Sequence, residues 1–354
     1  MKKRLLTARK KTLQEFDVAH KDDTNEQSEM RLQQSIYRAN RSWPIGHVSR
    51  DGVNYAWGNL LGPAAPANAN FLEDDELRAG IARYVARARA CALSQVDASV
   101  PQAVRRFCNA NIQERRLRSN LLSSQPMCCN LFVILMIEPG FGNLIRLLKA
   151  HFQFVRVDRV ELRLEYSPGR QQLEFLGDGT AFDAFLVVEA DGRRGFVAIE
   201  TKYHEKPDMK RLGQGKDRSR AEEARRRAHY VAVMQKCGAF DTKSRAFLDA
   251  AGGQAVTQTL RDHLLALTML SPWRPSAESF DFGHFLVLYP DRNNLVKQDA
   301  SVFASNLSCR QETFRHMSLE SFLAPADIES SSRLRAFWTR YLDFKAVDAM
   351  LGTP

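Results

Sequence analysis

Three side chains with complementary chemistry lie close together in this 354-residue chain: Asp183, Glu200 and Lys202. Carboxylates are hard oxygen ligands, and Mg²⁺ usually binds one or two of them while keeping several waters. A lysine ammonium beside them could orient or help activate an attacking water and offset charge on a phosphate. We therefore expect a hydrolytic metal site, with a surface ion pair and an ordinary turn aspartate as the alternative.

Two strands joined by a turn are expected to position these side chains. Residues 182–188 and 195–199 are mostly apolar, and the Asp-Gly pair at 191–192 favours a hairpin turn. Side chains alternate across a strand, so Glu200 and Lys202 should share one face. Charged groups at the end of a buried strand are costly unless they are paired or bind a metal.

Hydrophobic patterning predicts the elements around this hairpin. Ser123-Ser124 can cap a helix, and Pro-Gly pairs at 139–140 and 168–169 end the elements before them. From residue 125 to 290 the main order is helix, strand, strand, strand, helix, strand. The expected helices are 125–138, 141–152, 219–236 and 256–269, and the expected strands are 154–166, 182–188, 195–202 and 282–289.

The chain ends are expected to be mainly helical. Within the polar residues 1–45, the stretch 12–37 could hold one or two helices. Acidic residues 73–76 form the expected first turn of a helix that continues through 77–93, and a basic helix is expected at 102–118. We expect turns at 43–46 and 62–63, and loops at 206–216 and 291–308. A short helix is expected to begin at 318–320, and another helix is expected at 331–344. The resulting division is a helical extension at 1–120, a core at 121–295, and a helical extension at 296–354 that packs on the core.

The arrangement of Asp183 and Glu200-x-Lys202 resembles the signature of the PD-(D/E)XK nuclease superfamily. The likeness extends over about residues 120–270. Within the superfamily, the sequence of these residues is similar to one family assigned to restriction endonucleases. The resembling stretches are SSQPMCCNLF, EYSPGR, GDGTAFDAF, IETKYHE and QTLRDHLLA. Phe182 stands where the superfamily name implies proline. The resemblance implies a restriction-endonuclease-like α/β core, with a central mixed sheet flanked by helices and helical additions at both ends.

The resemblance also implies roles for individual residues. Asp183 and Glu200 would bind Mg²⁺, with Mn²⁺ as the expected substitute, and the Thr201 carbonyl would be an extra ligand. Water would then attack the scissile phosphate in line, beside Lys202. Glu165 is a further candidate acid, which we expect on the same strand face as Glu161; an exposed carboxylate is the alternative.

Gln125, Gln258 and Arg261 lie in the resembling stretches and are possible additional site residues. Gln125 is an amide of the SSQ stretch, and could be functional or form a hydrogen bond at a helix start. Gln258 and Arg261 belong to QTLRDHLLA, and Arg261 could hold a phosphate or the catalytic acids, or form a structural salt bridge. His263 fits a core histidine better than a general base.

A net charge of +10 and a sequence pI of about 9.4 favour an anionic partner, and nucleic acid is the simplest. Arg225, Arg226 and Arg227 could lie along a DNA backbone, where phosphate contacts give affinity without sequence information. The basic run at residues 2–11 is interpreted as a solvated end rather than a DNA arm.

Composition argues against several other classes. The six cysteines show no C-x-x-C spacing, so a zinc site is not expected, and no P-loop motif is present. The basic N-terminus lacks the apolar segment of a secretion signal, and no stretch approaches a membrane span. We expect a cytoplasmic protein with reduced thiols.

These observations predict a metal-dependent DNA endonuclease of a restriction or defence type. The alternatives are a non-catalytic DNA-binding module on the same fold, and a nuclease acting on RNA or single-stranded DNA. Cutting both strands usually needs two active sites, so a homodimer is also considered.

Overall fold

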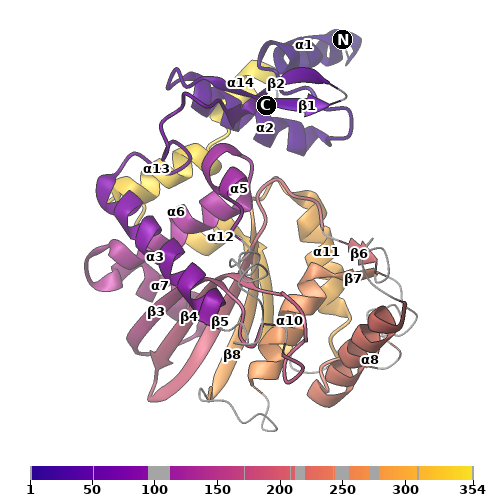
Figure 1. Ribbon diagram of the computed structural model, residues 1–354. Coiled ribbons are helices and arrows are strands. Elements are labelled where there is room, and N and C mark those ends of the chain that lie inside the picture. The colour runs from indigo at the N-terminus through magenta and orange to yellow at the C-terminus, as the bar shows by residue number, and fades with distance from the viewer. Residues whose placement is uncertain are drawn as a thin grey trace.

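A mixed five-stranded sheet forms the centre of the protein (Figure 1). The computed structural model describes residues 2–50, 52–94, 112–170, 172–207, 209–211, 220–241, 243, 255–270, 279–308 and 311–352. The strand order is β3-β4-β5-β8-β9. These strands are β3 (Val157–Tyr166), β4 (Phe182–Ala190), β5 (Arg193–Thr201), β8 (Phe282–Tyr289) and β9 (Phe314–Ser318). The sheet and its flanking helices confirm the expected α/β class.

The expected hairpin is present as β4 and β5. Asp191 and Gly192 form its turn with φ angles of 52° and 74°, a left-handed conformation that suits an Asp-Gly pair. The Asp191 carboxylate accepts hydrogen bonds from the backbone amides of Arg156, at 2.7 Å, and Val155, at 3.2 Å. This contact ties the turn to the segment that leads into β3.

The strand directions bring several chain segments to one edge of the sheet. β4 is antiparallel to both β3 and β5, whereas β8 is parallel to β5 and to β9. The last residues of β3 and β5 therefore lie beside the first residues of β4. Asp183, near the start of β4, is thereby placed close to Glu200, near the end of β5.

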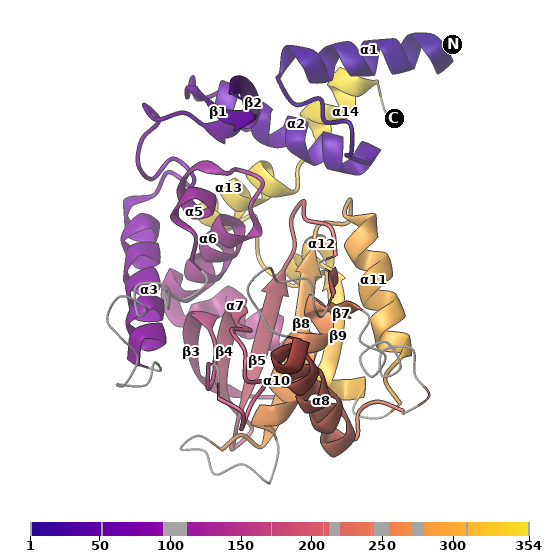
Figure 2. The ribbon, with the colours of Figure 1, turned by 45° about the vertical axis from the view of Figure 1, so that its right-hand side comes forward.

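Helices cover both faces of the sheet (Figure 2). Alternate strand residues contribute to two separate apolar clusters, as a sheet buried on both faces requires. One cluster includes residues from α3 (Asp75–Ser94), α6 (Ser124–Ile137), α7 (Gly142–Phe152) and α12 (Leu319–Leu323). The other includes residues from α8 (Arg220–Cys237), α10 (Gln258–Met269) and α11 (Asn294–Ser305).

The two ends of the chain pack against each other. Figure 1 shows the last helix, α14 (Lys345–Leu351), beside α1 (Lys2–Glu15) and α2 (Asn25–Ala39). The Gln33 side chain of α2 donates to the carbonyl of Thr339 in α13 (Ser332–Tyr341) at 3.1 Å. Both terminal segments therefore form one layer.

An unexpected hairpin lies within this terminal layer. β1 (Ile45–Arg50) pairs antiparallel with β2 (Val53–Leu61), in a segment expected to be helical apart from its turns. β2 packs against α2, where the Arg38 guanidinium donates to the Gly58 carbonyl at 2.8 Å. A two-stranded hairpin needs such packing to be stable.

The prediction of a loop at residues 291–308 is wrong, because α11 occupies most of it. Asn293 caps the helix by accepting from the Val296 amide at 3.3 Å, and Val296, Ala300 and Phe303 bury one face. β9, which follows, was also not predicted.

Other expectations fall partly on undescribed residues. In the stretch 206–216, β6 (Met209–Arg211) pairs with β7 (Ala255–Thr257), and residues 208 and 212–216 lie outside the described part of the chain. Of the basic helix expected at 102–118, residues 102–111 lie outside the described part, and the remainder includes α5 (Glu114–Ser119).

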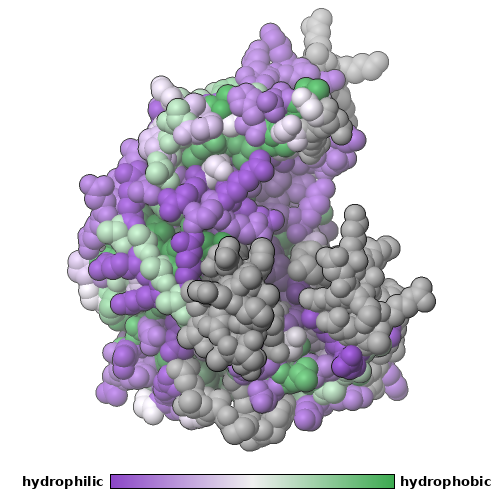
Figure 3. Space-filling model, viewed as in Figure 1, coloured by the Kyte–Doolittle hydropathy of each residue, from purple (hydrophilic) through white to green (hydrophobic). Residues whose placement is uncertain are grey.

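No single helix among the described residues is long and apolar enough to cross a membrane. α6 and the helical stretch at 139–152 reach the required length and composition only together, across a bend of 99°, and α6 lies in the core. Hydrophilic side chains cover most of the described part of the face in Figure 3.

Candidate active site

The candidate site forms where the ends of β3 and β5 meet the start of β4. The first residues of two helices approach this edge from opposite faces of the sheet: α6, capped by Ser123, and α10, capped by Thr257. A helix N-terminus carries partial positive charge and therefore favours nearby carboxylates. The second residue of α6 is Gln125, and the first residue of α10 is Gln258.

Asp183 is fixed by the strand beside it. Its Oδ2 atom accepts from the Thr201 amide at 2.8 Å and from Thr201 Oγ1 at 2.7 Å. These bonds hold the end of β5 against the start of β4, and they fix Thr201, the residue whose carbonyl was expected to be an extra metal ligand.

Glu200, Lys202 and Gln258 form a closed triangle of polar contacts. Lys202 Nζ lies 2.6 Å from Glu200 Oε1 and donates to Gln258 Oε1 at 2.8 Å. Gln258 Nε2 donates to the same Glu200 oxygen at 2.7 Å. Glu200 and Lys202 contact one α10 residue, as the expected alternation of side chains requires.

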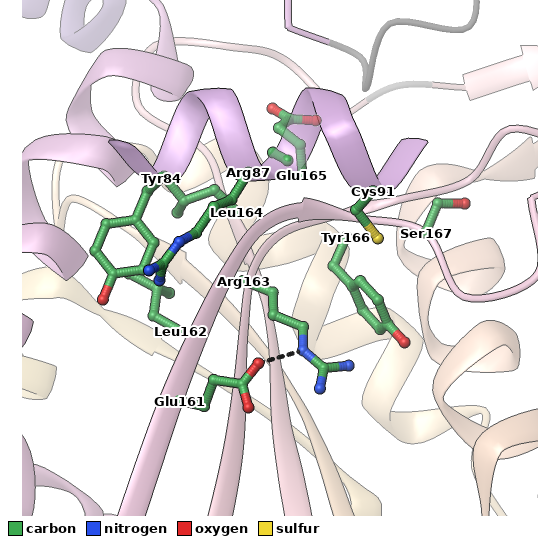
Figure 4. A pocket seen from close by; sticks show the side chains of 11 residues that line it. Tyr84, Arg87, Cys91, Glu161, Leu162, Arg163, Leu164, Glu165, Tyr166 and Ser167 are labelled. Atoms are coloured by element: carbon green, nitrogen blue, oxygen red, sulfur yellow. Dashed lines mark hydrogen bonds and ion pairs between the residues drawn. The ribbon is translucent and has the colours of Figure 1, made fainter. Parts of the chain in front are cut away.

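Glu165 joins the site from the end of β3. Its Oε1 atom accepts from Gln125 Nε2 at 2.6 Å, and only 8% of the residue is exposed. The expectation that it shares a strand face with Glu161 is wrong: Figure 4 shows it on the other side of β3 from Glu161 and Arg163. A left-handed φ of 49° at Glu165 breaks the alternation and turns its carboxylate toward α6.

Charge in the site is dominated by acids. Burial, followed by the charge of Asp183, raises the pKa of Glu165 to about 8 and that of Glu200 well above its usual range. Burial also raises the pKa of Asp183. Burial alone would lower the pKa of Lys202, but the carboxylates of Glu200 and Asp183 outweigh it and hold that pKa above the usual range. One ammonium thus faces three buried carboxyl groups.

The donor set fits a divalent cation of the Mg²⁺ type. Glu200 Oε2 is buried and has no hydrogen-bond partner in the described part of the chain, so this oxygen is available to coordinate a cation. The described residues contain no group of three or more His, Cys, Asp or Glu side chains suited to a metal. A magnesium site needs only one or two carboxylates with waters, and Asp183 and Glu200 supply two.

Two residues expected near the site have other partners. Arg261 Nη1 lies 3.9 Å from Asp178, which favours the structural salt bridge over a contact with the acids of the site. His263 is fully buried among aromatic rings, and burial lowers its pKa to about 3. It is a core histidine, as expected.

The arginines at 225–227 lie on α8, whose residues Tyr230, Val233 and Met234 are buried. Arg225 is exposed, and the other two are partly exposed. α8 packs against α10, the helix that carries Gln258, so these cations lie on the Gln258 side of the sheet (Figure 2).

Sequence reasoning missed the contacts that hold the segment after the motif. Glu205 accepts from the Ser124 amide and the Tyr203 amide, both at 2.9 Å, and so joins the motif strand to the start of α6. The Asn293 side chain donates to the Tyr203 carbonyl at 2.8 Å, and Gln34 donates to the Tyr203 hydroxyl at 2.9 Å. Glu205 stands in the IETKYHE stretch, but the remote partners gave no local signal.

Comparison with protein-family models gives a match to the PD-(D/E)XK nuclease superfamily over residues 21–343. The chain belongs to the PD-(D/E)XK nuclease superfamily. Members of this superfamily are nucleases, which hydrolyse phosphodiester bonds, and they generally use divalent metals. Comparisons with curated proteins and with solved structures gave no match.

The superfamily match covers more than the expected core. It begins before α2 and ends after α13, so it includes most of both terminal extensions. Gln34 of α2, which contacts Tyr203, therefore lies within the region that matches the PD-(D/E)XK model, whereas α1 and α14 lie outside it.

Proposed function

We propose that the protein is a Mg²⁺-dependent DNA endonuclease whose catalytic residues are Asp183, Glu200 and Lys202. The main support is the unpartnered Glu200 Oε2 atom, buried beside Lys202 at the strand edge that also carries Asp183. Excess buried acid beside one ammonium is the electrostatic arrangement that a bound cation would balance. The net charge of +10 supports a nucleic-acid substrate.

In this proposal the residues have separate tasks. Asp183 and Glu200 hold the ion, with the Thr201 carbonyl as an extra ligand, and Asp183 fixes Thr201 through hydrogen bonds from its amide and its hydroxyl. A bound divalent ion would polarise a phosphoryl oxygen and lower the pKa of its water. Lys202 orients the attacking water and offsets charge on the phosphate, while Gln258 fixes the ammonium.

Glu165 and Gln125 complete the site from the other face of the sheet. The Gln125 amide holds the Glu165 carboxyl at 2.6 Å, so this acid is positioned before any ligand arrives. We assign Glu165 as an additional acid of the site, and Gln125 as the residue that orients it. Arg225, Arg226 and Arg227 are proposed to contact the DNA backbone from α8.

Plasmid cleavage with Mg²⁺, Mn²⁺ or EDTA tests this function. Wild-type protein should nick or linearise the plasmid with either metal and leave it intact in EDTA, while Lys202→Ala should lose the activity. Lys149→Ala, an exposed lysine on α7, is the matched control and should cleave normally. Equal cleavage by Lys202→Ala and wild type would refute the assignment.

A non-catalytic DNA-binding module on the same fold is the second candidate. The basic charge balance fits it, but a module without catalysis would not need the buried Glu200–Lys202–Gln258 triangle. DNA binding without cleavage under every metal would favour it.

Cleavage confined to RNA or single-stranded DNA would retain the chemistry and change the substrate. A single linear product formed without a nicked intermediate would support two sites acting together in a homodimer.

A further inference from the structure

A cavity of about 240 Å³ lies between α3 and the outer strand β3, next to the candidate site (Figure 4). Glu165 belongs to both, because it lines the cavity and also accepts the hydrogen bond from Gln125 in the site. Whatever binds in the cavity would therefore lie beside an acid of the site. No task in the proposed reaction uses this space.

Two pairs of aromatic and cationic side chains line the cavity. On α3, the Arg87 guanidinium lies 5.8 Å from the centre of the Tyr84 ring. On β3, the Arg163 guanidinium lies 5.0 Å from the centre of the Tyr166 ring. Aromatic rings and guanidinium planes are the surfaces on which proteins stack unpaired bases.

The remaining lining combines apolar and hydrogen-bonding groups. Leu162, Leu164 and Ala88 supply apolar surface, while the Glu161 carboxylate accepts from Arg163 Nε at 2.8 Å. A carboxylate can accept from the amino group of a base, and a guanidinium can donate to its ring nitrogen or carbonyl oxygen. The cavity thus offers flat surfaces for stacking, hydrogen-bond donors and acceptors, and an apolar wall.

The size of the cavity and the charges of its lining restrict the class of ligand that it could bind. The volume is below the range of roughly 300–1,000 Å³ typical of pockets for drug-sized ligands, so it suits a single planar ring system. Glu161 pairs with Arg163, and Arg87 has no ion-pair partner among the described residues, so the Arg87 guanidinium is available to a base or a phosphate.

We propose that this cavity receives one base of the substrate strand, turned out of its stack beside the phosphate that is cut. This proposal rests on the proposed nuclease function. Extrusion of a base from a duplex costs least where the base is mismatched, damaged or already unpaired. The cavity would therefore make the enzyme prefer substrates that carry an unpaired or distorted nucleotide at the cut site.

Fluorescence of 2-aminopurine tests the proposal without cleavage. The probe is placed in turn at each position around the cut phosphate of a duplex, which is bound to Lys202→Ala in the presence of Mg²⁺. Ala88→Phe fills the cavity, and Ala82→Phe makes the same change at an exposed position of α3. Both are combined with Lys202→Ala and checked for normal thermal unfolding.

We expect fluorescence at one position to rise at least about threefold on binding, as an unstacked base requires. The rise should persist with Ala82→Phe and disappear with Ala88→Phe. Tyr84→Ala, which removes a stacking face without filling the space, should weaken binding of a duplex with an unpaired base by about tenfold. An unchanged rise with Ala88→Phe, or no rise at any position, would overturn the proposal.

Plasmid cleavage separates this proposal from the one it rests on. If wild type cleaves the plasmid but 2-aminopurine fluorescence does not change on binding, the base-pocket proposal is rejected and the nuclease proposal stands. Absence of cleavage and of DNA binding rejects the nuclease, and the base pocket with it.

Discussion

At the scale of single residues, the site is a group of buried acids held by two glutamines. Gln258 holds Glu200 from one face of the sheet, and Gln125 holds Glu165 from the other. Each glutamine lies in the first turn of a helix, where partial positive charge favours the acid it contacts. These amides position carboxylates whose own charges repel one another.

Gln258→Ala should lower kcat/KM for DNA cleavage by about 10- to 100-fold, the usual effect of removing a group that orients a metal ligand. The reason is that both Glu200 and Lys202 lose a fixed partner. Gln14→Ala, on the exposed side of α1, is the control. Steady-state kinetics of both variants checks this, and an effect on KM alone would argue for a substrate contact instead.

Asp262 should make folding stability depend on pH. Burial raises its pKa from 3.8 to about 7, so the folded state binds a proton more tightly than the unfolded state. Its contribution to stability is complete below about pH 4 and is lost as the pH rises through 7. As the pH rises from 4 to 8, wild type should lose on the order of 2–4 kcal/mol of unfolding free energy that the Asp262→Asn variant does not lose.

Urea unfolding at several pH values, with EDTA present, measures this difference. Asp75→Asn, at an exposed position of α3, provides the matched control and should follow the wild-type curve. Parallel curves for wild type and Asp262→Asn would show that Asp262 is not the titrating group.

At the scale of elements, patterning predicted the parts that carry their own signal. The turn at 191–192, the capped helix α6 and the apolar strand β8 all follow from local sequence. β9, with sequence FRHMS, lacks an apolar run, and pairing with β8 makes it a strand. The direction of Glu165 was not predictable, because a single left-handed residue reverses strand alternation.

The segment after the motif links β5 to the terminal layer. Tyr203 is fully buried and its hydroxyl accepts from Gln34 of α2 at 2.9 Å. Tyr203→Phe should lower the unfolding free energy by about 1 kcal/mol and reduce kcat several-fold, since Lys202 is the preceding residue. Tyr55→Phe, on the exposed β1–β2 hairpin, is the control for urea unfolding and kinetics. Lost stability with unchanged kcat would show that Tyr203 does not position Lys202.

At the scale of the whole molecule, the terminal extensions complete the core. Arg340 of α13 is fully buried, and its guanidinium donates to Asn70 Oδ1 at 2.6 Å and to the Asn70 carbonyl at 2.8 Å. Gln34 joins this network through the Arg340 carbonyl at 3.0 Å. Removing one end of the chain would leave buried polar groups of this network without partners, which costs folding free energy.

Residues 121–295 alone should therefore not fold cooperatively. Truncation would leave Tyr203 and the outer face of α6 exposed, with their polar partners missing. Urea unfolding of the fragment, followed by far-ultraviolet circular dichroism, should show a broad transition, whereas the full chain should show a sharp one. A sharp transition in the fragment would mean that the extensions are separate additions to a self-sufficient domain.

Binding of Mn²⁺, followed by electron paramagnetic resonance, tests the central claim that Asp183 and Glu200 hold a catalytic divalent ion. Wild type should bind the ion without DNA, and Asp183→Asn and Glu200→Gln should each weaken binding at least about tenfold. Glu189→Gln, a half-exposed acid of β4, should bind like wild type. Equal Mn²⁺ affinity in all four proteins would contradict the assignment of the metal site.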